Sequence, residues 1–166
     1  MITYLKGDAT RPTSDGPKVI MHICNSAGGW GAGFVLALSR RWPEPERQYR
    51  EWYRSSAYFA LGNVGWAKVE PELWVANMIA QAGYGSSGVE EHDTGEGSPP
   101  IRYEALRSCL VKVAKDAREM GASIHAPRIG CDLAGGSWAK VEALIQETMG
   151  DLQVYVYDFP GGRFNP

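Results

Sequence analysis

A continuous apolar run marks one segment of the chain as the centre of a sheet. Residues 19–24 read Val-Ile-Met-His-Ile-Cys and are apolar on both faces of an extended strand, which is typical of a central parallel strand. Shorter apolar segments between glycines, prolines and polar residues predict the remaining strands. These are 2–6, 64–70, 73–79, 123–129 and 153–159.

Apolar residues spaced three or four positions apart predict helices. Leu106, Cys109, Leu110 and Val113 share one face of a helix over 103–120, which Gly121 ends. Further helices are predicted over 34–42, 46–54 and 138–149, with Ser137 as the N-cap of the last. Strands and helices alternate along the chain, so we expect an α/β fold with a mixed central sheet and helices on both faces.

Two glycine-rich loops each follow a strand and lead into a helix. The first spans residues 22–33 and the second 130–136. Glycines let backbone N–H groups approach an anion closely, so two such loops suit a ligand with two phosphates. Neither loop has the Gly-x-Gly-x-x-Gly or Gly-x-x-x-x-Gly-Lys-Ser/Thr pattern, which disfavours nicotinamide redox chemistry and ordinary NTP hydrolysis. The alternative is that both are only tight turns.

Composition narrows the class of protein. The chain has 166 residues and a formal net charge of −2, which fits one domain with no general attraction to nucleic acid or anionic membranes. Five arginines on the two early helices form either a solvated face or a site that attracts a modified nucleic acid or polymer: Arg40, Arg41, Arg47, Arg50 and Arg54. Three cysteines without Cys-x-x-Cys spacing are expected to be reduced, and no metal site is predicted. We expect a cytoplasmic monomer with no membrane contact.

Four motifs in order resemble the macrodomain, a module that binds ADP-ribose. They are Gly7-Asp8-Ala9-Thr10, His22-Ile23-Cys24-Asn25, Gly29-Trp30-Gly31-Ala32-Gly33 and Pro127-Arg128-Ile129-Gly130-Cys131. The resemblance covers residues 1–160 as a single three-layer α/β/α domain and leaves 161–166 as a C-terminal tail. Within the family the chain is similar to a branch that includes a terminal ADP-ribose glycohydrolase, a chromatin-remodeller macrodomain and a yeast ADP-ribose-1″-phosphate phosphatase.

The resemblance implies a role for each loop in binding ADP-ribose. Asp8 would accept a hydrogen bond from the adenine amino group beside the Ala9 N–H, Asn25 would face the distal ribose, and Phe159 would pack by the adenine. The cradle for the diphosphate and distal ribose would come from both loops: Trp30, Gly31, Ala32 and Gly33 from the first, and Gly130, Cys131, Asp132, Leu133, Ala134 and Gly135 from the second. The structural alternatives are a turn capped by Asp8, a loop braced by Asn25, and core roles for Trp30 and Phe159.

The catalytic residues of the related glycohydrolase do not carry over to this chain. The related glycohydrolase has a lysine where this chain has Gln81 and an aspartate where it has Ala134, and glutamine cannot form a covalent adduct with the ribose. Asp132 and His22 are therefore the candidates for activating water, helped by Gln81 and Asn25, although His22 is equally well read as a core histidine.

We expect an ADP-ribosyl hydrolase that needs no cofactor and removes mono-ADP-ribose from protein or nucleic acid, favouring links to Asp or Glu side chains. The alternatives are a non-catalytic reader of ADP-ribose and a phosphatase acting on ADP-ribose 1″-phosphate.

Overall fold

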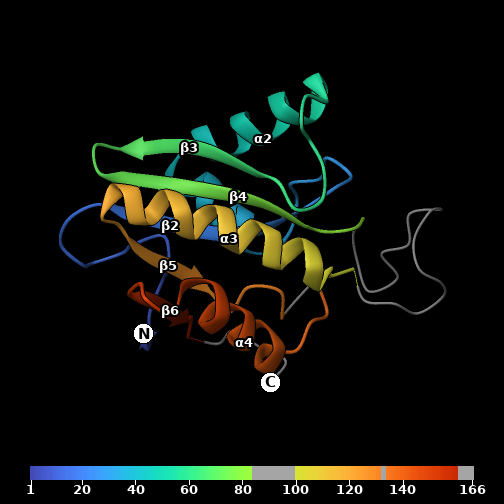
Figure 1. Ribbon diagram of the computed structural model, residues 1–166. Coiled ribbons are helices and arrows are strands. Elements are labelled where there is room, and N and C mark those ends of the chain that lie inside the picture. The colour runs from blue at the N-terminus through green and yellow to red at the C-terminus, as the bar shows by residue number, and fades with distance from the viewer. Residues whose placement is uncertain (84–99, 132–133, 161–166) are drawn as a thin grey trace.

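The computed structural model describes residues 1–83, 100–131 and 134–160. The predicted surface loop at 83–100 and the predicted tail at 161–166 lie almost entirely outside the described residues. Six strands form one sheet in the order β1-β6-β5-β2-β4-β3 (Figure 1). They are β1 (Ile2–Lys6), β2 (Lys18–Asn25), β3 (Val64–Glu70), β4 (Leu73–Gln81), β5 (Ser123–Pro127) and β6 (Val154–Asp158).

The sheet is mixed, as predicted, because one edge strand runs against the others. Neighbouring strands pair in parallel from β1 across to β4, whereas β3 pairs with β4 antiparallel through a tight turn. The run predicted to be central is β2, where Val19, Ile20 and Met21 are fully buried. A strand covered on both faces cannot place polar side chains toward water, which explains its composition.

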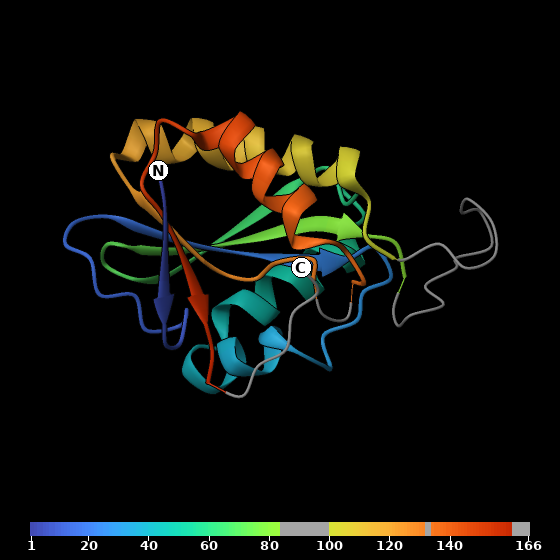
Figure 2. The ribbon, with the colours of Figure 1, turned by 90° about the horizontal axis from the view of Figure 1, so that it is seen from below.

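Helices cover both faces of the sheet and make three layers (Figure 2). α1 (Phe34–Arg41) and α2 (Glu44–Ser55) pack on one face around Leu38 and Tyr49. α3 (Tyr103–Met120) and α4 (Trp138–Met149) pack on the other around Leu110 and Ile145. The predicted three-layer α/β/α architecture is therefore confirmed.

Two predicted strand ends and one predicted helix cap need correction, while α1, α2 and β6 differ from their predicted bounds by one or two residues. β4 continues two residues further, to Gln81, and so carries that side chain to the edge of the sheet where the loops meet. β5 ends at Pro127 because the Ile129 N–H bonds back to the Pro127 carbonyl oxygen at 2.7 Å, which closes a turn. Ser137 occupies the N-cap position of α4, but its side chain makes no capping hydrogen bond; instead its backbone N–H donates to the Tyr103 hydroxyl at 2.9 Å.

Candidate functional site

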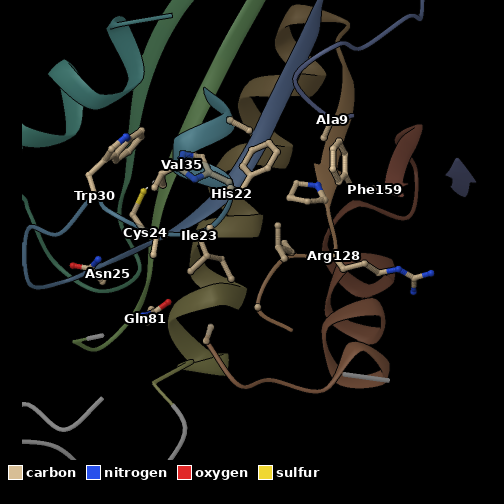
Figure 3. A pocket seen from close by; sticks show the side chains of 18 of the residues that line it. Ala9, His22, Ile23, Cys24, Asn25, Trp30, Val35, Gln81, Arg128 and Phe159 are labelled. Atoms are coloured by element: carbon tan, nitrogen blue, oxygen red, sulfur yellow. Dashed lines mark hydrogen bonds between the residues drawn. The ribbon is translucent and has the colours of Figure 1, made fainter. Parts of the chain in front are cut away.

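A pocket of about 920 Å³ opens where the parallel strands end. Its walls come from the segments that follow β1, β2, β4, β5 and β6 and from α1 and α2. Figure 3 shows Ala9 and Phe159 at one end of the pocket and Asn25 with Gln81 at the other. Carboxyl ends of parallel strands meet at one edge of a sheet, and this is the usual position for ligands in such folds. The two glycine-rich loops predicted to converge do so here.

The end with Asp8 is built on a short turn between β1 and β2. Asp8 Oδ1 accepts hydrogen bonds from the backbone N–H and the hydroxyl of Thr10, both at 2.8 Å. The structural alternative for Asp8 is thus observed, while its second carboxylate oxygen lies 3.9 Å from Arg11 Nε. Because Asp8 lines the pocket with its side chain 30% exposed, its predicted contact with adenine stays open to test.

Phe159 follows β6 at the same end of the pocket. Its side chain is 65% exposed, so the alternative that it belongs to the core is wrong. An aromatic ring that lines a pocket and faces solvent offers a flat apolar surface for another ring to stack against. The role predicted for Phe159 beside adenine remains a prediction.

Asn25 holds the first glycine-rich loop together from inside. Its Oδ1 accepts from the N–H groups of Ala27 at 2.9 Å and Gly29 at 3.1 Å, and its Nδ2 donates to the Gly29 carbonyl oxygen at 2.8 Å. The Tyr49 hydroxyl adds bonds to both Asn25 oxygens, at 2.6 Å to the backbone and 3.0 Å to the side chain. Asn25 therefore braces its loop as well as lining the pocket, and its contact with a distal ribose is untested.

Trp30 serves as both wall and core. Only 5% of its surface is exposed, and its indole N–H donates to Ser39 Oγ at 2.8 Å. The ring packs 5.5 Å from the His22 ring and 5.4 Å from Tyr49, measured between centroids. Beyond it, Gly31, Ala32 and Gly33 are exposed and line the pocket, and Gly33 reaches φ 79° immediately before α1. This places the start of a helix behind the backbone N–H groups of the loop.

The second glycine-rich loop contributes Gly130 and Ala134 to the wall. Gly130 has φ 77°, and the Gly136 N–H bonds to its carbonyl oxygen at 2.6 Å. The Cys131 side chain is buried and does not line the pocket, and its Sγ lies 3.4 Å from the Ile129 carbonyl oxygen. Burial raises the pKa of this thiol to about 11. Gly135 is exposed and does not line the pocket. Asp132 and Leu133, predicted to act here, lie outside the described residues.

Gln81 ends β4 opposite Asn25 in the strand register. Its Nε2 donates to the Gly83 carbonyl oxygen at 3.0 Å, and its backbone carbonyl accepts from the Ser26 N–H at 2.8 Å. The side chain reaches the pocket as a neutral amide that donates and accepts hydrogen bonds but is not a nucleophile.

His22 lies on the floor of the pocket with 1% of its surface exposed. Its Nε2 is 2.5 Å from Asn77 Oδ1 on the neighbouring strand β4. Burial lowers the pKa of His22 from 6.5 to about 4, and the bond to Asn77 only partly offsets this. His22 is therefore neutral at pH 7, a property of the core histidine alternative that does not suit a general acid.

Two charged side chains of the pocket wall were not among the residues predicted to bind the ligand. Arg40 on α1 and Arg50 on α2 line the wall, so the solvated-face alternative does not account for these two of the five early arginines. Arg50 Nε pairs with Glu46 Oε2 at 2.8 Å. The spacing of Phe34, Ala37 and Arg40, three residues apart on one helical face, was the available signal.

Arg128 also lines the pocket, but its charge is already engaged. Its guanidinium bonds both carboxylate oxygens of Asp158, at 2.7 and 2.9 Å, and lies over the rings of Tyr4 and Trp138. Within residues 1–83, 100–131 and 134–160, no three His, Cys, Asp or Glu side chains are grouped to hold a metal. No helix in the same ranges is long and apolar enough to cross a membrane.

The three-layer α/β/α fold, with its glycine-rich loops converging on a pocket at the carboxyl ends of parallel strands, places the chain in the α/β class of proteins, whose ligands bind at that edge of the sheet. The fold of a macrodomain protein from Streptomyces coelicolor superposes with a TM-score of 0.79 at 49% identity, covering 95% of this chain and 99% of that one. The chain belongs to the macrodomain family. A Bacteroides thetaiotaomicron protein described as of unknown function is 51% identical with a TM-score of 0.88, over 95% of this chain and 98% of the other.

More distant relatives carry functional names. The zebrafish chromodomain-helicase-DNA-binding protein 1-like is 31% identical over 93% of this chain, which spans only 15% of that protein's length. The yeast ADP-ribose 1″-phosphate phosphatase is 24% identical over 94% of this chain and 97% of its own. No family model matches the chain.

Proposed function

We propose that this chain binds ADP-ribose and hydrolyses the bond between mono-ADP-ribose and an acidic side chain of a modified protein. The observation that carries the proposal is the shape of the pocket. It extends from Asp8 and Phe159 at one end to Asn25 and Gln81 at the other, with the glycine loops between them. A ligand with a base, a diphosphate and a second ribose matches this sequence of surfaces. The substrate named for the yeast phosphatase is such a ligand.

The proposed reaction breaks the bond between the anomeric carbon of the distal ribose and a carboxylate oxygen. Water adds to that carbon, the protein carboxylate leaves with the bonding electrons, and one proton is released. Charge develops as an oxocarbenium-like state that the nearby diphosphate oxygens stabilise. A carboxylate is a good leaving group, so the reaction does not require a lysine nucleophile at the position of Gln81.

We assign water orientation to the amides of Gln81 and Asn25 and water activation to Asp132. His22 receives no proton-transfer role in this scheme because burial lowers its pKa to about 4, which makes it a weak base and leaves it no second proton to donate at pH 7. Arg40 brings positive charge to the wall formed by α1 and α2, where Arg50 is already paired with Glu46, and this charge favours a ligand carrying two phosphates.

A phosphatase acting on ADP-ribose 1″-phosphate is the second candidate. The observation that favours it is the yeast relative, 97% of whose length aligns with this chain. Both reactions would use the same pocket and differ in the bond that is broken.

The experiment compares two substrates and one ligand on the purified chain. Calorimetry measures ADP-ribose affinity, and a labelled glutamate-linked mono-ADP-ribosyl protein and ADP-ribose 1″-phosphate report turnover. Release of the label faster than release of phosphate is the expected result. Tight binding with no release of label over hours would leave a reader of ADP-ribose and overturn the hydrolase assignment. Faster phosphate release would establish the second candidate.

Asp132→Asn tests the assignment of water activation, because it keeps the size of the side chain and removes its basicity. Turnover is expected to fall by at least tenfold with ADP-ribose affinity changed less than threefold. Equal loss of both quantities would indicate a binding or folding role for Asp132.

A further inference from the structure

The ring of His22 faces the α1 and α2 side of the sheet, where it packs against two aromatic residues. Its centroid lies 5.5 Å from the Trp30 ring and 5.8 Å from the Phe34 ring. All three residues line the pocket, and Figure 3 shows His22 between the two ends of that pocket. The imidazole is thus a polar group set into an otherwise apolar part of the floor.

Hydrogen bonds around Asn77 fix which nitrogen of His22 carries its proton. Asn77 Nδ2 lies 2.9 Å from the carbonyl oxygen of Pro45 and 2.8 Å from Gln48 Oε1. The Pro45 carbonyl can only accept, so the Asn77 amide must turn its nitrogen toward α2 and its oxygen toward His22. That oxygen can only accept as well, so His22 Nε2, 2.5 Å away, must carry the hydrogen. In a neutral imidazole, Nδ1 is then a bare acceptor.

His22 Nδ1 has no partner in the described parts of the chain, although it is fully buried there. Cys24 is a titratable residue in contact with the ring. Its Sγ lies 3.8 Å from the other ring nitrogen, Nε2. Burial raises the pKa of this thiol, so it brings no charge at neutral pH. Buried acceptors without partners are rare in native proteins. Because His22 lines the pocket under the Trp30 and Phe34 rings, a ligand can satisfy this acceptor once those rings move aside.

We propose that His22 Nδ1 determines specificity by accepting a hydrogen bond from an uncharged donor of the bound ligand, either an amino or a hydroxyl group. The identity of the ligand rests on the proposed function, and ADP-ribose offers both kinds of donor. An acceptor repels phosphate oxygens, so the pocket has backbone donors in its loops for phosphates and an acceptor in its floor for the other groups. Proton donation from His22 in either candidate reaction is incompatible with this arrangement.

The first test reads the tautomer in the free protein. Nitrogen chemical shifts of labelled histidine distinguish a protonated from an unprotonated ring nitrogen. At pH 7 we expect the hydrogen of His22 on Nε2, and a change in the Nδ1 shift when ADP-ribose is added. A hydrogen on Nδ1, or a doubly protonated ring, would overturn the proposal without reference to catalysis.

The second test uses two variants that separate the nitrogens. His22→Gln retains a donor near the Nε2 position for Asn77 but no acceptor near Nδ1, whereas His22→Asn retains an acceptor near Nδ1. Calorimetry should show ADP-ribose affinity at least tenfold weaker for His22→Gln, and within about threefold of wild type for His22→Asn. Equal affinities for wild type and His22→Gln would contradict the proposal.

Ligand analogues on the unmodified protein identify the donor and guard against misfolded variants. ADP-ribose analogues that lack the adenine amino group, or one ribose hydroxyl at a time, are compared on wild type and His22→Gln. The analogue that lacks the donor to His22 should bind wild type about tenfold more weakly than ADP-ribose does. On His22→Gln, the same analogue and ADP-ribose should bind with equal affinity. If every analogue loses equally on both proteins, His22 is not the acceptor. Failure of folded wild type to bind ADP-ribose at all would instead refute the proposed function.

Discussion

Acidification should destabilise this protein well before its carboxylates titrate. His22 and His125 are both buried, and burial lowers the pKa of each from 6.5 to about 4. His125 has both nitrogens in hydrogen bonds, Nε2 with Ser14 and Ser123 and Nδ1 with the Tyr157 hydroxyl at 2.8 Å. The third histidine, His92, lies outside the described residues.

The sign and size follow from proton linkage. Below pH 6.5 the unfolded chain binds protons at these histidines and the folded chain does not, so the free energy of unfolding rises with pH between about 4 and 6.5. Between pH 7 and pH 5, a shift from 6.5 to about 4 removes about 2 kcal/mol of stability for each histidine, or about 4 kcal/mol for the pair. The paired carboxylates have lowered pKa values, so their contribution is lost at more acidic pH.

Urea unfolding followed by tryptophan fluorescence at half-unit steps from pH 7 to pH 5 measures this dependence. His22→Gln serves as the matched control, because it removes one of the two histidines and should roughly halve the slope. A free energy of unfolding that stays constant within about 0.5 kcal/mol over this range would refute the reasoning, since it would mean that both histidines protonate in the folded state.

Three further predictions concern the pocket. Asp8→Asn keeps an oxygen for the hydrogen bonds from Thr10 but replaces the second carboxylate oxygen with a donor. The free energy of ADP-ribose binding measured by calorimetry should weaken by about 1 to 3 kcal/mol with an unchanged melting temperature. Unchanged affinity would count against the adenine contact. Phe159→Ala should weaken ADP-ribose binding without loss of stability because the ring is 65% exposed, and a drop in melting temperature would point to a packing role. Gly136→Ala places a Cβ 2.4 Å from the Gly130 carbonyl oxygen and should cost about 1 to 3 kcal/mol in urea unfolding, whereas Gly31→Ala meets open space and should leave stability unchanged.

The positions of most elements could be predicted from the sequence because their patterns are local. The spacing of Leu106, Leu110 and Val113 predicts α3 with its observed bounds, and the glycine at 121 ends the helix in a left-handed conformation. Strand ends were less certain, because the end of β5 depends on a turn closed at Ile129. Ser137 takes the predicted N-cap position, but its side chain makes no capping hydrogen bond, and its own backbone N–H donates to the Tyr103 hydroxyl of α3.

The candidate site divides in the same way. The glycine loops and Asp8 were identified from the sequence, since glycine and aspartate in those turns are visible as motifs. Arg40 and Arg50 were not assigned to the pocket, because only the packing of α1 and α2 against the sheet brings them to its wall. Asn25 was expected to face the ligand, and only the folded loop reveals how many of its hydrogen bonds are made within the protein.

The sequence by itself determined that this is an α/β chain of the macrodomain type with two glycine-rich loops after its strands, because those features depend on residue type and spacing along the backbone. Only the tertiary structure decided the chemistry of His22. Its protonation depends on Asn77, which is 55 residues away along the chain, and on a proline carbonyl of α2 that orients the amide. Hydrogen-bond direction is set by groups that meet in space, and so it cannot be predicted from one strand alone.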